Sequence, residues 1–278
     1  MSFKLVVDSS CELDREFVEK YNVEVIPFGV QVGDYFVEDD ENCNQLELLE
    51  KIANSAECGK SSCPSPERFV EAYKTEVERI YVVTLSSRLS GCYNSANLAR
   101  DLYIEKNGDK KICLVDSKSA SCGESQIAMK IAQMEDEGLG YDVIVKKIMA
   151  YRDEMKTFFV LNNLDTLRKN GRLTGIKSVV ASTLNIKPVM SALDGDIIQL
   201  GQAIGIKKAL GKMVDTIVKN VANTAEKSLI ISNCNCLERA NMVKEMFESK
   251  AKFASIKIIN TRGLSSLYAN DGGIIVTV

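Results

Sequence analysis

Four serine-rich segments contain the side chains of this chain that are best suited to hold an anion. Hydroxyl groups and free backbone amides at the start of a helix bind phosphate or carboxylate. Gly91, in one of the segments, would let a ligand approach the backbone closely. Serine is also a common cap and turn residue, so each segment has a purely structural interpretation as well. The segments are Asp8-Ser9-Ser10, Ser61-Ser62, Ser86-Ser87 with Ser90-Gly91, and Ser117 with Ser119 and Ser121.

One arginine stands in a turn where its guanidinium could meet an anionic group. Asn170-Gly171-Arg172-Leu173 is a turn sequence, and the planar fork of Arg172 matches a carboxylate or a phosphate. A surface ion pair is the alternative role for this side chain. Lys187, in the run that precedes a second turn, is a weaker candidate for a functional role.

The composition excludes several kinds of site. The 278 residues include no histidine, which excludes Ser-His and Cys-His nucleophiles and histidine-ligated metals. None of the nine cysteines forms a Cys-x-x-Cys pair, and the pairs Cys58/Cys63 and Cys234/Cys236 match a four-thiolate zinc site poorly. We therefore predict no metal. With 35 basic and 38 acidic side chains, the sequence does not indicate a nucleic-acid partner.

The sequence carries neither an export signal nor a membrane span that we can identify. Its first residues enter a strand-like run without the apolar core of a signal peptide, and no apolar run approaches ~18 residues. An odd number of cysteines without paired spacing is typical of reduced, mostly buried thiols. We expect a cytoplasmic protein.

The elements that must position these side chains alternate between strand and helix over residues 1–155. Such alternation predicts a doubly wound parallel sheet, with the four serine segments at the carboxyl ends of its strands. Asp14 and Ser65 are predicted helix caps, and Pro66 occupies a first helical position. The predicted strands are 3–7, 23–32, 79–85 and 111–115, and Ser61-Ser62 lies in a polar loop.

Residues 156–278 predict a second α/β domain with a mixed sheet. Asp194-Gly195 between two apolar runs predicts a hairpin. Pro188 lies in the first of these runs, which indicates an edge strand or the start of a strand. Apolar spacing predicts an amphipathic helix over 204–221 and a short helix over 179–184.

The two halves differ in charge. Residues 1–155 carry 18 basic and 29 acidic side chains, whereas residues 156–278 carry 17 basic and 9 acidic ones. Two faces that attract each other would explain this difference. A basic docking surface for an acidic partner or a phosphate is the second interpretation.

The order of the motifs resembles that of the DegV family over nearly the whole chain. Asp8-Ser9-Ser10 is similar to the family's opening motif, and Ser61-Ser62-Cys63-Pro64-Ser65 to its Thr-Ser-Gln-Pro-Ser loop. Further matches follow in family order. They are Leu85 to Ala96, Asp116-Ser117, Leu164 to Leu173, Leu184 to Pro188, and Asp194-Gly195.

The resemblance implies a protein of two α/β domains that binds a long-chain fatty acid in a tunnel between them. It further implies that the protein has no chemistry and no cofactor of its own. It would present the fatty-acid carboxylate to a fatty-acid kinase, as a step toward phospholipid synthesis. Carried onto this chain, the carboxylate ligands are Ser61 and Ser90, with Arg172 near them. The full predicted binding set is Ser61, Ser62, Ser90, Gly91, Arg172 and Tyr268.

The sequence departs from the family at one expected carboxylate ligand. Where the family has a histidine near its C-terminus, this chain has Tyr268, which can still donate one hydrogen bond. An alternative hypothesis is an enzyme that acts on a small phosphorylated or carboxylated substrate at the same serine loops. Without histidine, its general base would have to be a carboxylate such as Asp8 or Asp116, or a Lys or Cys with a shifted pKa. A regulatory protein whose basic half docks a partner is a third hypothesis.

Overall fold

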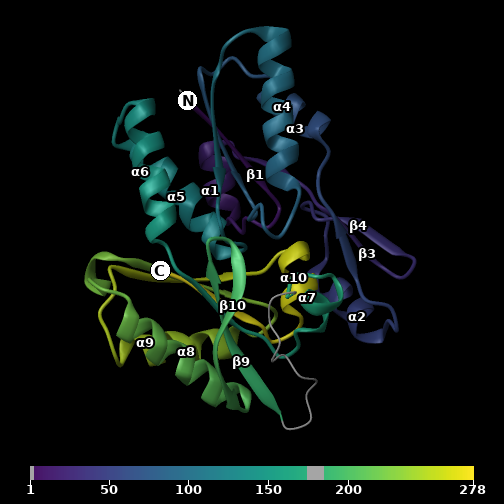
Figure 1. Cartoon of the computed structure of the whole chain (residues 1–278), viewed down its shortest axis with the longest axis vertical. Coiled ribbons are helices and arrows are strands. Elements are labelled where there is room, and N and C mark those ends of the chain that lie inside the picture. The colour runs from purple at the N-terminus through teal and green to yellow at the C-terminus, as the bar shows by residue number, and fades with distance from the viewer. Residues whose placement is uncertain (1–2, 174–184) are drawn as a thin grey trace.

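A parallel sheet lies at the centre of the first half, as predicted. The computed structural model describes residues 3–173 and 185–278. Every pair of neighbouring strands in this sheet runs parallel, and the strand order is β2-β1-β6-β7 (Figure 1). The strands are β1 (Phe3–Asp8), β2 (Glu24–Ile26), β6 (Arg79–Thr84) and β7 (Lys111–Asp116).

Helices cover both faces of this sheet because successive side chains of each strand point to opposite sides. On β6, Tyr81 and Val83 pack with α5 and α6, whereas Ile80 and Val82 pack with α3 and α4. Both faces are therefore buried, which is the doubly wound arrangement that the sequence predicts. The helices are α1 (Arg15–Tyr21), α3 (Pro66–Tyr73), α4 (Cys92–Asn107), α5 (Cys122–Asp136) and α6 (Tyr141–Glu154).

A small antiparallel sheet corrects two predictions about the first half. The strand predicted over 23–32 is divided at Pro27, which has no backbone N–H to donate to a sheet. Ser61 and Ser62 lie in a strand rather than a loop, and Val30 pairs with Ser61. The sheet has the order β4-β3-β5 and packs with one helix. These elements are β3 (Gly29–Val32), β4 (Tyr35–Glu38), β5 (Lys60–Ser62) and α2 (Gln45–Asn54).

The second half is built on a six-stranded mixed sheet, as predicted, with the order β10-β9-β8-β13-β11-β12. Only β11 and β12 pair in parallel, and the remaining neighbours are antiparallel. The strands are β8 (Thr157–Val160), β9 (Ile186–Leu193), β10 (Asp196–Ile204), β11 (Ser228–Asn233), β12 (Ser255–Asn260) and β13 (Ile274–Thr277). The helices are α7 (Asp165–Lys169), α8 (Ile206–Asn220), the 3-10 turn η1 (Thr224–Glu226), α9 (Leu237–Glu248) and α10 (Gly263–Ala269).

The β9–β10 hairpin turns at Asp194-Gly195, where both residues have positive φ, so the predicted hairpin is confirmed. β9 itself is an interior strand. Pro188 is the third residue of β9. Strand β8 pairs with β9 only at Met190 and Ser191, so the N–H that Pro188 lacks is not needed for a hydrogen bond to β8.

The helix expected over 204–221 is shorter, because Ile204 still belongs to β10. The helix expected over 179–184 lies outside the described residues.

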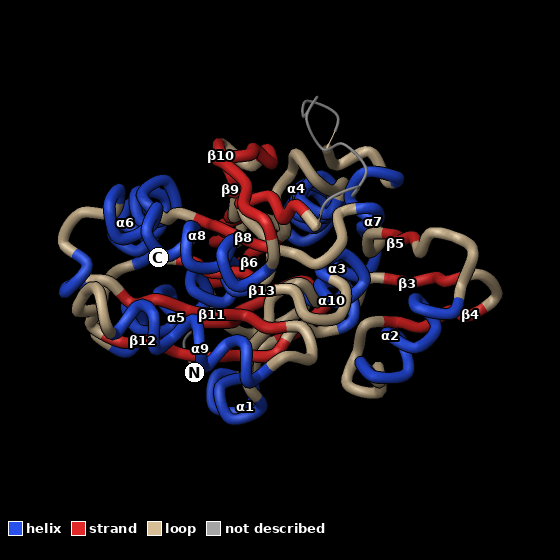
Figure 2. The backbone as a smooth tube through the Cα atoms, turned by 90° about the horizontal axis from the view of Figure 1, so that it is seen from below, coloured by secondary structure: helices blue, strands red, loops and turns tan. Residues whose placement is uncertain are grey.

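The two halves share an interior. Helices α8 and α9 cover one face of the mixed sheet, and α5 of the first half packs against β11 and β13 on the other (Figures 1 and 2). None of the described sheets pairs a strand before residue 155 with one after it. The domain boundary at 155/156 stays a prediction. No helix in the described part of the chain is long and apolar enough to traverse a bilayer.

Candidate functional site

A largely apolar cavity lies between the two halves. It encloses about 850 Å³ of space, including open solvent at its mouth. Both halves contribute to its wall, because the strand ends of the parallel sheet face the mixed sheet and α10. Its apolar side chains include Phe28, Leu85, Leu89, Phe159, Leu161 and Leu167.

Four of the six predicted binding residues line this cavity. Ser61, on β5, shares a hydrogen bond of 2.9 Å with the Tyr268 hydroxyl at the end of α10. The guanidinium of Arg172, just after α7, lies 5.7 Å from the centre of the Tyr268 ring, which is cation–π distance. Its Nε donates to the Leu89 carbonyl at 3.1 Å, and this contact holds it beside Ser90. Ser90 precedes α4, and its hydroxyl accepts from an amide of the first turn.

These four side chains come from four separate elements and form one polar end of the cavity. Arg172 also donates through Nη1 to the Asn170 carbonyl, whereas Nη2 has no acceptor among the described residues. The Nη2 of the Arg172 guanidinium can therefore donate to an anion, beside the hydroxyl groups of Ser61 and Ser90. Tyr268 lies at this polar end, and it is the residue that stands where the resembled family has its carboxylate-binding histidine.

The structure places the other two predicted residues off the cavity wall. Ser62 is exposed and points toward Gly29, where an added Cβ would lie 2.5 Å from the Ser62 Oγ. Gly91 is an exposed helix cap with an ordinary φ of −74°. An added Cβ there would meet only the Cys63 Sγ, at 3.6 Å, so nothing in the geometry requires glycine.

The remaining serine segments do lie at the strand ends, but most of their polar groups are engaged in turns. Asp8 accepts from the Ser10 and Leu85 amides, and Asp116 accepts from the Ser87 amide and hydroxyl. The two carboxylates proposed as general bases are therefore occupied by backbone and loop contacts. Neither Asp8 nor Asp116 lines the cavity.

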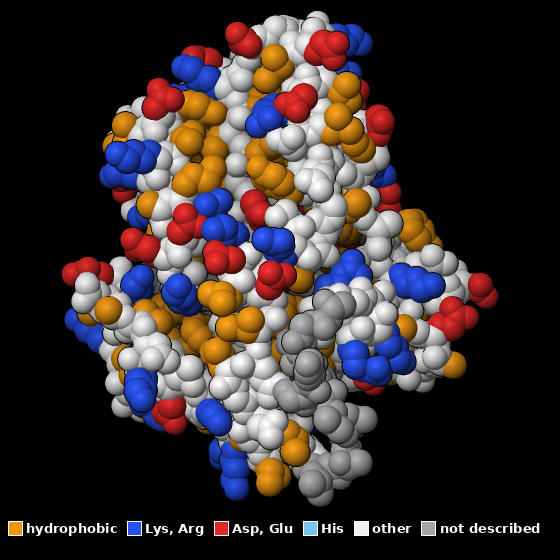
Figure 3. Space-filling view, in the orientation of Figure 1, with side chains coloured by type: hydrophobic (Ala, Val, Ile, Leu, Met, Phe, Trp, Pro, Cys, Tyr) orange, Lys and Arg blue, Asp and Glu red, His pale blue; other side chains and the backbone are white. Residues whose placement is uncertain are grey.

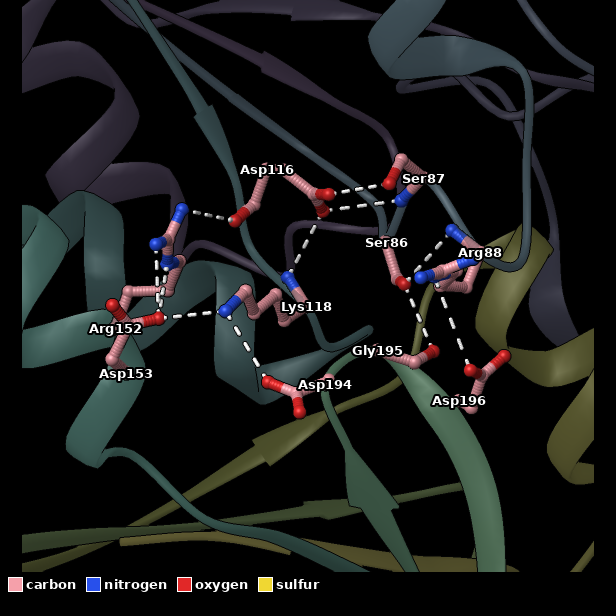
Figure 4. Close-up of polar contacts among 10 residues, drawn as sticks. All are labelled: Ser86, Ser87, Arg88, Asp116, Lys118, Arg152, Asp153, Asp194, Gly195 and Asp196. Carbon is pink, nitrogen blue, oxygen red and sulfur yellow. Dashed lines mark hydrogen bonds and ion pairs between the residues drawn. The ribbon is translucent and has the colours of Figure 1, made fainter.

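The tip of the β9–β10 hairpin closes one side of the cavity. Gly195 lines the wall, and its carbonyl accepts from the Ser86 hydroxyl at 2.9 Å. Lys118 pairs with Asp194 at 3.4 Å on one flank of the tip, and Arg88 lies 3.9 Å from Asp196 on the other (Figure 4). Figure 3 shows acidic and basic side chains interspersed where the two halves meet on this face.

Two buried acids behind the cavity, Glu12 and Glu124, are absent from every sequence prediction, and they lie with Asp8, which the sequence does single out. Asp8, Glu12 and Glu124 are at most 2% exposed. Ser10 and Ser121, which line the cavity, connect them to its wall. Nothing in the sequence marks Glu12 and Glu124 as buried, since each lies between residues of mixed polarity.

Burial raises the pKa of all three carboxyls. It raises the pKa of Glu12 to about 7, although hydrogen bonds from Ser121, Ser265 and Ser232 act in the opposite direction. The pKa of Glu124 is raised well above its usual value by burial and then by the Asp8 charge. Burial also raises the pKa of Asp8, against the amides of Leu85 and Ser10.

The described residues contain no group of three or more acidic or thiol side chains arranged to hold a metal ion. All nine cysteines are free. Cys58 accepts a weak hydrogen bond from Asn170, and Cys236 donates one to the Gly273 carbonyl.

Comparisons with known proteins give the same family over the whole chain. The model of the DegV family, described as an uncharacterised protein family, matches residues 2–276. A DegV domain-containing protein of Streptococcus gordonii is 35% identical, and the match covers 99% of this chain and 98% of that one.

Two solved structures have the same fold throughout. A DegV-family protein from Ruminococcus gnavus, refined with vaccenic acid, is 49% identical with a TM-score of 0.97, and all of both chains is covered. The fatty-acid kinase (Fak) B3 protein of Streptococcus pneumoniae, loaded with linoleic acid, is 32% identical with a TM-score of 0.88. That match covers 100% of this chain and 99% of the other.

Proposed function

This chain belongs to the DegV family, and we propose that it binds one long-chain fatty acid in the cavity between residues 1–155 and 156–278. The observation that carries the proposal is a largely apolar cavity with one polar end made by Ser61, Arg172 and Tyr268. The bound fatty acids of the two similar structures support it.

The acyl chain of a fatty acid matches the apolar wall of the cavity, and its carboxylate matches the polar end. Each buried methylene contributes about 0.8 kcal/mol, before the cost of association, so a long chain supplies most of the affinity. A carboxylate that leaves water must keep its hydrogen bonds. The Ser61 and Ser90 hydroxyls, with the Nη2 of Arg172 that has no acceptor among the described residues, would supply them without histidine.

We also propose that the chain is a carrier and not an enzyme, and that it presents the carboxylate to a fatty-acid kinase. Ser61, Ser90, Arg172 and Tyr268 are only partly buried, so the polar end is within reach of a partner. The kinase would transfer the terminal phosphoryl group of ATP to a carboxylate oxygen, which gives an acyl phosphate and ADP. The similarity to a protein named as a fatty-acid kinase component supports this step.

Titration of delipidated protein with fatty acids of increasing length tests the carrier proposal. We expect the affinity to rise by up to about fourfold per methylene until the cavity is full. We expect the methyl esters to bind more weakly, because they carry no charge for Arg172. Saturable binding of inorganic phosphate or acetate, with no dependence on chain length, would favour the small-anion enzyme instead.

A phosphoryl-transfer assay tests the kinase proposal separately. Protein loaded with fatty acid is mixed with ATP and a fatty-acid kinase, and acyl phosphate is trapped with hydroxylamine. We expect product only when kinase and loaded protein are both present. Product from the loaded protein and ATP alone would show that this chain is itself an enzyme.

A further inference from the structure

The Glu12 carboxyl joins three elements behind the cavity. Its Oε2 accepts from the Ser121 hydroxyl, before α5, at 2.5 Å and from the Ser232 hydroxyl on β11 at 3.0 Å. The Ser265 hydroxyl of α10 faces the same carboxyl. Because Glu12 belongs to the first half and Ser232 and Ser265 to the second, this acid is a joint between the halves.

The joint forms part of the cavity's own wall. Ser121 and Ser265 line the cavity, as does Ser10, whose hydroxyl accepts from the Ser121 amide at 3.0 Å. A displacement of the hydroxyl groups around Glu12 therefore moves residues that contact the ligand. Such a displacement also changes how β11 and α10 lie against α5.

In the described part of the chain, no Lys or Arg forms an ion pair that would stabilise the charged form of this carboxyl. Glu12 is 2% exposed, and its Oε1 has no hydrogen-bond partner among the described residues. Its hydrogen-bond donors among the described residues are the Ser121 and Ser232 hydroxyls, whereas the Ser265 hydroxyl faces the carboxyl without a hydrogen-bond partner. The described Lys and Arg side chains form no ion pair with Glu12 or with its acidic neighbours. The titratable groups that face it are Asp8, Glu124, Cys11, Cys122 and Cys234.

We propose that protonation of Glu12 controls how tightly the cavity holds its acyl chain, with the neutral form retaining the ligand and the ionised form releasing it. This inference rests on the proposed function, since it assigns a regulation to the same cavity. An ionised carboxyl in a dry joint, beside other acids, is costly unless water enters. Water that enters beside Glu12 would compete with the hydroxyls of Ser121 and Ser232 for the carboxyl, and a shift of Ser121 would disturb the cavity wall that it lines.

The direction of the effect follows from the burial of this acid. Burial raises the pKa of Glu12 to about 7, so the carboxyl ionises across the neutral range. The complex should therefore be most stable at lower pH and should release its ligand faster as the pH rises. If the ligand stabilises the neutral form by one pKa unit, affinity falls about tenfold over that range.

The dissociation rate of a fluorescent long-chain fatty acid, measured from about pH 6 to about pH 8.5, tests this inference. Glu12→Gln keeps the shape and the hydrogen-bonding groups but cannot titrate. Glu24→Gln, on a partly exposed carboxylate that pairs with Lys4, is the matched control. We expect release to accelerate about tenfold with pH in the wild type and in the control, and much less in Glu12→Gln.

Ionisation of the fatty acid itself is common to all variants, so the difference between profiles isolates Glu12. Equal profiles in wild type and Glu12→Gln, or a flat wild-type profile, overturn the inference while leaving the carrier function intact. Absence of binding at every pH would overturn the proposed function instead. If Glu12→Gln fails to fold, Ser232→Ala is the second test. The Ser232 hydroxyl stabilises the ionised carboxyl, so its loss should move the midpoint of the release profile to higher pH, and an unchanged midpoint would overturn the inference.

Discussion

The hydrogen bond between Ser61 and Tyr268 makes a quantitative prediction about carboxylate binding. The Ser61 hydroxyl can donate to a bound carboxylate only if the Tyr268 hydroxyl donates to the Ser61 Oγ, across the observed 2.9 Å. Ser61→Ala removes a bond to a charged group and should weaken fatty-acid binding by about 1.5–3 kcal/mol, or roughly tenfold or more. Tyr268→Phe removes a neutral bond and should cost about 0.5–1.5 kcal/mol.

The double variant separates a direct from an indirect role for Tyr268. Because Tyr268 is expected to act through Ser61, Ser61→Ala with Tyr268→Phe should bind no more weakly than Ser61→Ala alone. The assay is displacement of a fluorescent fatty acid by the free acid and by its methyl ester. Ser62→Ala is the control, since Ser62 is exposed and lies off the cavity wall.

Three results would refute this reasoning. The two losses could add fully in the double variant, which would give Tyr268 a role independent of Ser61. The methyl ester could lose as much affinity as the acid, which would mean that the hydroxyls do not act on the carboxylate. Ser62→Ala could weaken binding as strongly as Ser61→Ala, which would place the ligand elsewhere.

Three further predictions concern the cavity wall and the stability of the fold. Ala192→Trp, on the wall, should fill the cavity and abolish fatty-acid binding while the circular dichroism spectrum is retained. Tyr81→Phe removes the hydroxyl that donates to Glu135 at 2.6 Å, and urea unfolding should show a loss of about 1–3 kcal/mol. The pKa of Glu12 is near its ordinary 4.5 in the unfolded chain and about 7 in the folded one, so this carboxyl should lower the stability by about 3 kcal/mol as the pH rises between these values. Glu12→Gln should reduce the pH-dependent fall in thermal stability by that amount and leave the share of Asp8 and Glu124, whose pKa values are also raised.

The sequence predicts the two sheets because their signals are local. Apolar runs such as the one around Val82 and Val83 identify buried strands, and Asp194-Gly195 identifies the hairpin. Pro27 was within reach of the same reasoning, since a residue without an N–H ends the predicted strand over 23–32. The pairing of Ser61 with Val30 was not, because a three-residue polar strand has no periodicity of its own.

The polar end of the cavity could be predicted only through family resemblance. Nothing local brings Arg172 and Tyr268 together, and each is equally credible as an isolated surface residue. The resemblance assigned the carboxylate to Ser61, but the predicted set also included Ser62, whose side chain leaves β5 on the opposite side. The burial of Glu12 was likewise invisible, since it depends on β11 and α10, more than two hundred residues away.

Mass spectrometry of the freshly purified protein tests the central claim most directly. The intact chain is weighed under native conditions, and its organic extract is analysed in parallel. We predict one long-chain fatty acid per chain, and uptake of one after delipidation and reloading. A chain that carries no fatty acid, and gains none when fatty acid is added, would contradict the account.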